Sequence, residues 1–159
     1  MHTKSYDDPT NDPSRETIDN MTDGPDFLKG TDGLLPAIAQ DAQTLQVLMM
    51  AWMNQEAYLE TLASGYATYY SRSRKKLWRK GEESGHRQRV LQVRVDCDAD
   101  CILVMVHQTG AACHEGYANC FFRQATSDGL IVDQVRLVNP ESVYKNKHGS
   151  QSLDSGLPE

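Results

Sequence analysis

The chain has 159 residues, of which 39% are hydrophobic and 24% charged, and a formal net charge of −6 at pH 7. This composition is typical of a single globular domain. The negative charge argues against duplex nucleic acid as a partner. The chain has no run of about 18 apolar residues, so no membrane span is expected. The N-terminus lacks the apolar segment of a secretory signal, so we expect a cytoplasmic protein whose four cysteines are reduced.

Two polar segments flank the body of the chain. Residues 1–26 contain three prolines and no hydrophobic periodicity, and we interpret them as a mobile arm. Residues 140–159 have the composition of a tail, which leaves 27–139 as the folded domain. Apolar runs and alternating patterns within this domain predict strands at 34–40, 45–53, 67–71, 90–95, 101–108 and 130–138.

One helix is expected, at residues 54–64. Asn54 is a suitable N-cap, Glu56 lies in the first turn, and Gly65 closes the segment. The preceding run 45–53 is either a strand buried on both faces or the core of a helix, and a strand is favoured because it leaves Asn54 free to cap. The predicted fold class is therefore α+β, mainly antiparallel β with one clear helix.

The segment 71–80 is strongly basic and is expected to be a loop or an edge of the sheet. Guanidinium and ammonium groups suit phosphate recognition, and Trp78 adds a flat surface for packing or stacking. Runs of charge are nevertheless often only solvated loops. The basic residues are Arg72, Arg74, Lys75, Lys76, Arg79 and Lys80.

Three carboxylates occur within five residues at Asp96, Asp98 and Asp100. Their mutual repulsion would be relieved by a hard cation. The spacing matches the start of an EF-hand loop, but the glycine and the final glutamate of that loop are absent, so a calcium loop is rejected. In an extended strand these carboxylates would share one face, with Cys97 and Cys101 on the other. The alternative is a solvated acidic turn with Cys97 as a buried small residue.

Two further cysteines, Cys113 and Cys120, lie in an expected irregular loop over residues 110–120. For both to bind one zinc ion the loop must fold back, which Gly110 and Gly116 permit. Together with Cys97 they would leave one zinc position open for water. One alternative is that Cys101 closes the zinc site as a fourth, structural ligand. Another is that Cys113 and Cys120 are two buried free cysteines that bind no metal.

Seven segments, taken in order, resemble the phosphoribosyl-AMP cyclohydrolase family between about Phe27 and Arg123. They are residues 33–38, 47–57, 70–74, 77–82, 84–88, 96–100 and 113–121. The resemblance implies zinc binding by Cys97, Cys113 and Cys120, and magnesium binding by Asp96, Asp98 and Asp100. It also implies an intertwined homodimer in which Cys97 of one subunit joins Cys113 and Cys120 of the other, while Cys101 is incidental.

The activity implied by the resemblance is a step of histidine biosynthesis. Zinc-activated water would open the purine ring of phosphoribosyl-AMP between N1 and C6 to give the phosphoribosyl-formimino aminoimidazole carboxamide ribotide. His114, next to Cys113, is the candidate for proton transfer. Arg72, Arg74 and Lys80 are expected to bind phosphate, and Glu82 and Ser84 to contact substrate. The competing hypothesis is a non-enzymatic zinc module that binds single-stranded nucleic acid.

Overall fold

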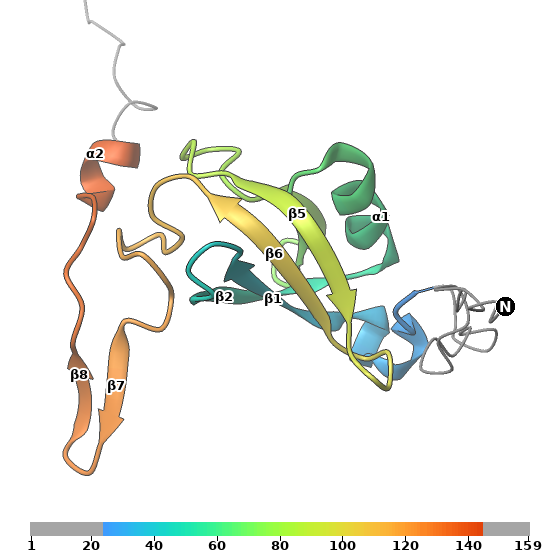
Figure 1. Ribbon diagram of the computed structural model, residues 1–159, viewed down its shortest axis with the longest axis horizontal. Helices are drawn as coiled ribbons and strands as arrows, with labels where there is room; N and C mark the ends of the chain where they lie inside the picture. Colours follow the sequence, from blue (N-terminus) through green and yellow to red (C-terminus); the bar gives the residue numbers. More distant parts are fainter. Residues whose placement is uncertain (1–23, 145–159) are drawn as a thin grey trace, which may run out of the picture.

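The computed structural model describes residues 24–144 and shows an α+β fold (Figure 1). Six strands form one sheet in the order β4-β3-β2-β1-β6-β5. All neighbouring pairs are antiparallel except β1 and β6, which are parallel. The strands are β1 (Leu35–Asp41), β2 (Val47–Met53), β3 (Thr68–Ser71), β4 (Lys76–Arg79), β5 (Gln88–Val95) and β6 (Ile102–Gln108). The predicted fold class is thus confirmed, with one parallel pair that was not expected.

Much of the core lies along the neighbouring strands β1 and β6 of the sheet. Alternate residues of β1 are buried, namely Leu35, Ala37 and Ala39, and β6 has the same alternation. This is the period-two pattern of strands with one face against the core. The corresponding buried residues of β6 are Ile102, Val104 and Val106.

The predicted helix is present as α1 (Gln55–Ser64). The Asn54 side chain accepts a hydrogen bond of 2.9 Å from the backbone N–H of Ala57, as an N-cap does. Gly65 ends the helix in the left-handed conformation, with φ of 71°. Ala57 and Thr61 are the buried residues of α1, so its small side chains allow close packing on the sheet.

The run at 45–53 forms strand β2, as favoured, but it is not buried on both faces in the single chain. Val47 is 42% exposed and Met50 is 43% exposed. Large apolar side chains at such positions commonly mark a surface that another molecule covers.

The C-terminal part of the described chain differs from the prediction. β7 (Arg123–Thr126) and β8 (Gly129–Val132) form a separate hairpin that projects from the large sheet (Figure 1). The predicted strand at 130–138 is wrong beyond Val132, because the N–H groups of Leu137 and Val138 donate to the carbonyl of Gly116 and not to a neighbouring strand. A short helix, α2 (Pro140–Tyr144), follows where only tail had been expected.

Two 3₁₀ turns, η1 (Phe27–Lys29) and η2 (Thr31–Gly33), precede β1. The proposed N-terminal arm lies outside the described residues except for its last three positions. Within residues 24–144 no helix is long and apolar enough to cross a membrane.

Candidate active site

A cavity of about 450 Å³ lies between β4, the loop that follows it and the loop at 110–120. It gathers residues that are distant in the sequence, and five of them are predicted site residues other than a cysteine. We call it the thiol cavity, and its polar lining includes Arg74, Lys80, Glu82, Ser84, His114 and Cys120.

The loop that carries Cys113 and Cys120 folds back on itself, as the zinc hypothesis required. The N–H of Cys113 donates to the carbonyl of Tyr117, and the N–H of Gly116 donates to the carbonyl of Cys113. Gly116 has φ of 88°, and a Cβ there would lie 2.1 Å from the carbonyl oxygen of Val138, so only glycine fits.

The thiols of Cys113 and Cys120 lie near each other in the folded loop. Burial, followed by the charge of Cys113, raises the pKa of the Cys120 thiol to about 11. Two adjacent thiols, poorly solvated, have the donor chemistry that zinc prefers. The pair therefore fits part of a zinc site.

The ammonium group of Lys80 lies close to this pair. Burial lowers its pKa, while the charges of Cys120 and Cys113 act in the opposite direction. Lys80 is therefore placed both to neutralise thiolates and to face the cavity, rather than on an open basic surface.

Cys97 lies away from the other two zinc candidates in the single chain. It is exposed, in the turn before β6, whereas Cys113 follows the other end of that strand. Because β6 has seven residues, its ends are separated by roughly 20 Å. Among residues 24–144 no group of three metal-binding side chains includes these cysteines.

The acidic segment forms a tight turn between β5 and β6, so its prediction as an extended strand is wrong. Asp96 Oδ1 accepts hydrogen bonds of 3.0 Å from the N–H groups of Asp100 and Cys101, and Ala99 has φ of 63°. These hydrogen bonds close the turn and replace the strand geometry. The alternative of an acidic turn is therefore correct, except that Cys97 is exposed and not buried.

The turn nevertheless brings the three carboxylates together. One oxygen each from Asp96, Asp98 and Asp100 lies within 4.8 Å of the others. Burial, and then the charges of Asp98 and Asp96, raise the pKa of Asp100, whereas hydrogen bonding, led by the Cys101 N–H, lowers that of Asp96. Closely spaced oxygen ligands under mutual repulsion fit a hard divalent cation.

Arg72 does not join the other predicted substrate residues. Its guanidinium lies over the ring of Trp52, 4.7 Å from the centroid, and it lines neither of the two cavities at β4. This cation–π contact explains its position on the single chain.

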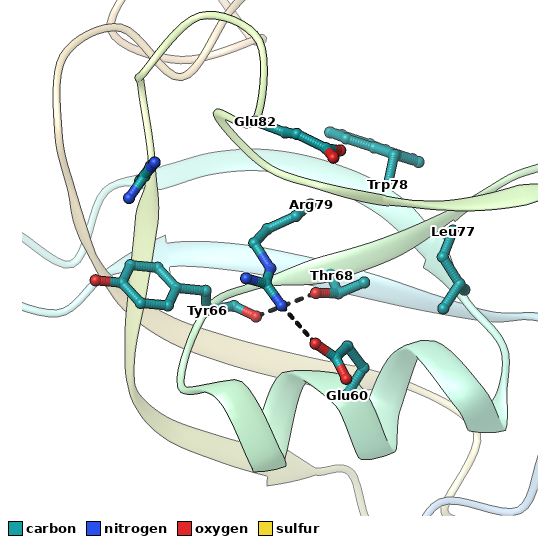
Figure 2. Close-up of a pocket in the computed structure, with 8 residues that line it drawn as sticks. Glu60, Tyr66, Thr68, Leu77, Trp78, Arg79 and Glu82 are labelled. Carbon is teal, nitrogen blue, oxygen red and sulfur yellow. Dashed lines mark hydrogen bonds and ion pairs between the residues drawn. The ribbon is translucent and has the colours of Figure 1, made fainter.

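A second cavity, of about 480 Å³, adjoins the first and was missed by the sequence analysis (Figure 2). We call it the arginine cavity. Glu60 of α1 forms an ion pair there with Arg79 of β4. Of its lining residues, Glu82 was an expected substrate contact, and Arg79 and Arg87 fall within the family-like segments 77–82 and 84–88. Its polar lining consists of Glu60, Tyr66, Thr68, Arg79, Glu82 and Arg87.

Comparison with known proteins identifies the family of the chain. Residues 49–122, which include most of the thiol cavity, match the model of the family described as phosphoribosyl-AMP cyclohydrolase. A protein of that name from Methanocorpusculum labreanum is 58% identical over 117 residues, which cover 74% of this chain and 93% of the relative. Another from Bordetella avium is 56% identical over 126 residues, covering 76% and 93%. The chain is therefore an enzyme of the phosphoribosyl-AMP cyclohydrolase family.

Proposed function

We propose that the chain hydrolyses phosphoribosyl-AMP between N1 and C6 of its purine ring, as a step of histidine biosynthesis. The observation that carries this proposal is the thiol cavity. It combines a half-buried thiol, an exposed histidine and several cations in one space, which is what a metal-assisted hydrolysis of a phosphorylated substrate needs.

The metal ligands in this proposal are those expected from the sequence. Cys113 and Cys120, with Cys97, would hold zinc, and the acidic turn would hold magnesium. A zinc ion with three protein ligands supplies, when bound, a water molecule of lowered pKa as the nucleophile. Two observations support these assignments. The thiols of Cys113 and Cys120 lie near each other, which suits zinc, and the three carboxylates of the acidic turn converge, which suits magnesium.

Proton transfer is assigned to His114. Its side chain is exposed at the cavity and is adjacent in sequence to the ligand Cys113. In the reaction the water oxygen bonds to C6, the N1–C6 bond breaks, one proton from water passes to N1, and the other is released to solvent as the cationic ring becomes a neutral carboxamide. Near neutral pH an imidazole can both accept and return the proton that passes to N1.

The remaining polar groups of the thiol cavity are assigned to substrate binding. Arg74 and Lys80 would bind phosphate, with Lys80 also balancing the charge of the thiols. Glu82 and Ser84 would contact ribose hydroxyls or the ring. The phosphate role expected of Arg72 gains no support from either cavity.

The subunits are inferred to act as a homodimer. Since Cys97 lies at the far end of β6 from Cys113, a complete three-thiol site needs Cys97 from a second copy of the chain. No observation favours the non-enzymatic zinc module, which would need Cys101 as a fourth ligand.

A direct assay tests the activity. Purified protein mixed with phosphoribosyl-AMP is expected to change the ultraviolet absorbance as the purine ring opens, and a chelator should abolish the change. Cys97→Ser should lose both zinc and turnover. Full zinc content with normal turnover in this variant would defeat the ligand assignment, and no absorbance change with the wild-type protein would defeat the proposed activity.

A further inference from the structure

The thiol cavity and the arginine cavity share a wall. Both are lined by Leu77, Trp78 and Arg79 of β4, and by Glu82 just after it. Their volumes are about 450 Å³ and 480 Å³. One ligand resting on this wall can therefore extend into both cavities.

An aromatic ring and a carboxylate stand together on the shared wall. Trp78 is half-buried, and its ring packs on Tyr69 with centroids 5.1 Å apart. Glu82, labelled with Trp78 in Figure 2, lines both cavities together with that ring. The combination suits a flat ring that carries positive charge, because the indole offers a stacking surface and the carboxylate offers the opposite charge.

Backbone geometry fixes the position of Glu82. Its N–H donates to the carbonyl of Arg79 over 3.1 Å, which closes a turn directly after β4. Gly81 has φ of 79°, and a Cβ at this residue would lie 2.5 Å from the carbonyl carbon of His86. The turn therefore requires glycine, and it keeps Glu82 at the end of the wall that β4 forms.

Each cavity contains a cation available for phosphate. Arg74 and Lys80 line the thiol cavity. In the arginine cavity the charge of Arg79 is already met by Glu60, whereas Arg87 is exposed and forms no ion pair with any of the residues 24–144. Arg87 is thus the free cation on that side.

We propose that phosphoribosyl-AMP lies across this wall, with its purine on Trp78 beside Glu82 and one phosphoribosyl arm in each cavity. This inference rests on the proposed function. The substrate carries its arms on N1 and N9, at opposite ends of a purine that is cationic through N1 substitution. Two cavities that each contain a cation free to bind phosphate, joined by a wall with an aromatic ring and a carboxylate, match that distribution of charge and shape.

The position of the thiols sets the direction of the substrate. C6, the carbon attacked by water, must face Cys120 and His114 in the thiol cavity. N1 is bonded to C6, so the N1 arm lies in the thiol cavity near Arg74. The N9 arm, which is the AMP portion, lies in the arginine cavity near Arg87.

Two variants of the metal-loaded enzyme test this arrangement. Arg87→Gln and Arg74→Gln are each expected to raise the KM for phosphoribosyl-AMP about tenfold, since each removes one charged hydrogen bond to phosphate. AMP, used as a competitive inhibitor, has only the N9 arm. Its inhibition constant should therefore rise about tenfold in Arg87→Gln and stay unchanged in Arg74→Gln.

Arg89→Gln is the matched control, because Arg89 is an exposed arginine of β5 that lines neither cavity. Its KM and inhibition constant should equal those of the wild type. An unchanged KM in Arg87→Gln, or equal effects of the Arg87 and Arg74 variants on AMP, would overturn the proposed position. Either result would leave turnover by the wild type intact, so failure of this inference is distinguishable from failure of the proposed function.

Discussion

At the level of single residues, the surroundings of Cys120 differ from those of an ordinary buried cysteine. Its thiol lies near that of Cys113 and near the ammonium of Lys80. Cys101 has no such neighbours, and it lies in the acidic turn, where burial and the carboxylates of Asp96 and Asp100 raise its pKa. The pKa is therefore raised at both cysteines, but only Cys120 has a second thiol beside it and a nearby ammonium, Lys80, whose charge acts to lower its pKa.

Replacing Cys120 and replacing Cys101 are predicted to have opposite effects on the zinc content of the protein. Cys120→Ser is expected to weaken zinc binding by at least about tenfold, because a thiolate ligand is lost. Cys101→Ser should retain the zinc content of the wild type. Metal analysis after dialysis against a weak chelator measures both. Zinc loss in Cys101→Ser with full zinc in Cys120→Ser would reverse the assignment.

The pKa of Cys120 predicts how zinc affinity depends on pH. Because that pKa is raised to about 11, the thiol is protonated in the metal-free protein at pH 7, and zinc must displace its proton. Binding that releases protons strengthens as pH rises, by about tenfold per pH unit for each proton released. Competition titrations with a zinc indicator at pH 6 and pH 8 should therefore show weaker binding at pH 6. Equal affinity at both values would contradict a protonated thiol at this position.

At the level of elements, the turn between β5 and β6 shows how hydrogen bonding gathers like charges. The side chain of Asp96 accepts hydrogen bonds from two backbone N–H groups of the turn, and the ammonium of Lys29 in η1 donates a hydrogen bond to the carbonyl of Asp98. The N–H of Asp26 also donates to the carbonyl of Ala99 over 2.7 Å. These bonds hold the turn against the repulsion of its carboxylates, which a divalent cation would relieve.

Asp98 is the carboxylate to replace, because Asp96 also holds the turn together. Magnesium at millimolar concentration should raise the melting temperature of the wild type by a few degrees, since a ligand that binds only the folded state stabilises it. Asp98→Asn should remove most of that increase. Asp133→Asn, which changes an exposed aspartate elsewhere, is the control and should keep it. Thermal melts with and without magnesium decide, and an unchanged increase in Asp98→Asn would count against the cation site.

Local signals explain which elements were predictable. The helix α1 has an N-cap at Asn54 and a terminating Gly65, both of which act within a few residues, and it was predicted closely. The acidic turn was not, because Asp-x-Asp-x-Asp alternates equally well in a strand, and the turn depends on hydrogen bonds and on the positive φ of Ala99. The same holds for β8, whose end is set by contacts with the loop around Gly116.

The candidate site was predictable in its residues but not in its shape. Cys113, Cys120 and His114 were identified from residue type and from family resemblance, and the structure brings Cys113 and Cys120 together. The arginine cavity was not foreseen, because Glu60 of α1 and Arg87 before β5 become neighbours only through the sheet. Pairing of distant strands is a tertiary property without a local sequence signal.

At the scale of the whole molecule, the single chain leaves too much apolar surface open. The β7–β8 hairpin pairs with no strand of the large sheet, and an isolated two-stranded hairpin is marginally stable in water. Val135, just beyond it, is 86% exposed. Apolar surface of this kind usually marks an interface. Its members on the hairpin and after it are Leu130, Ile131, Val132, Val135 and Leu137.

A homodimer with shared zinc sites makes a sharp prediction about mixed subunits. Cys97→Ser and Cys120→Ser should each be inactive alone, because each breaks both sites of its own dimer. A heterodimer of the two contains one site with every cysteine intact, so co-expression in equal amounts should restore about a quarter of the wild-type activity. Co-expression of Cys113→Ser with Cys120→Ser is the control and should restore none, because both changes fall on the same side of each site. If all three thiols instead came from one chain, no mixture of these variants would regain activity, and the shared site would be disproved.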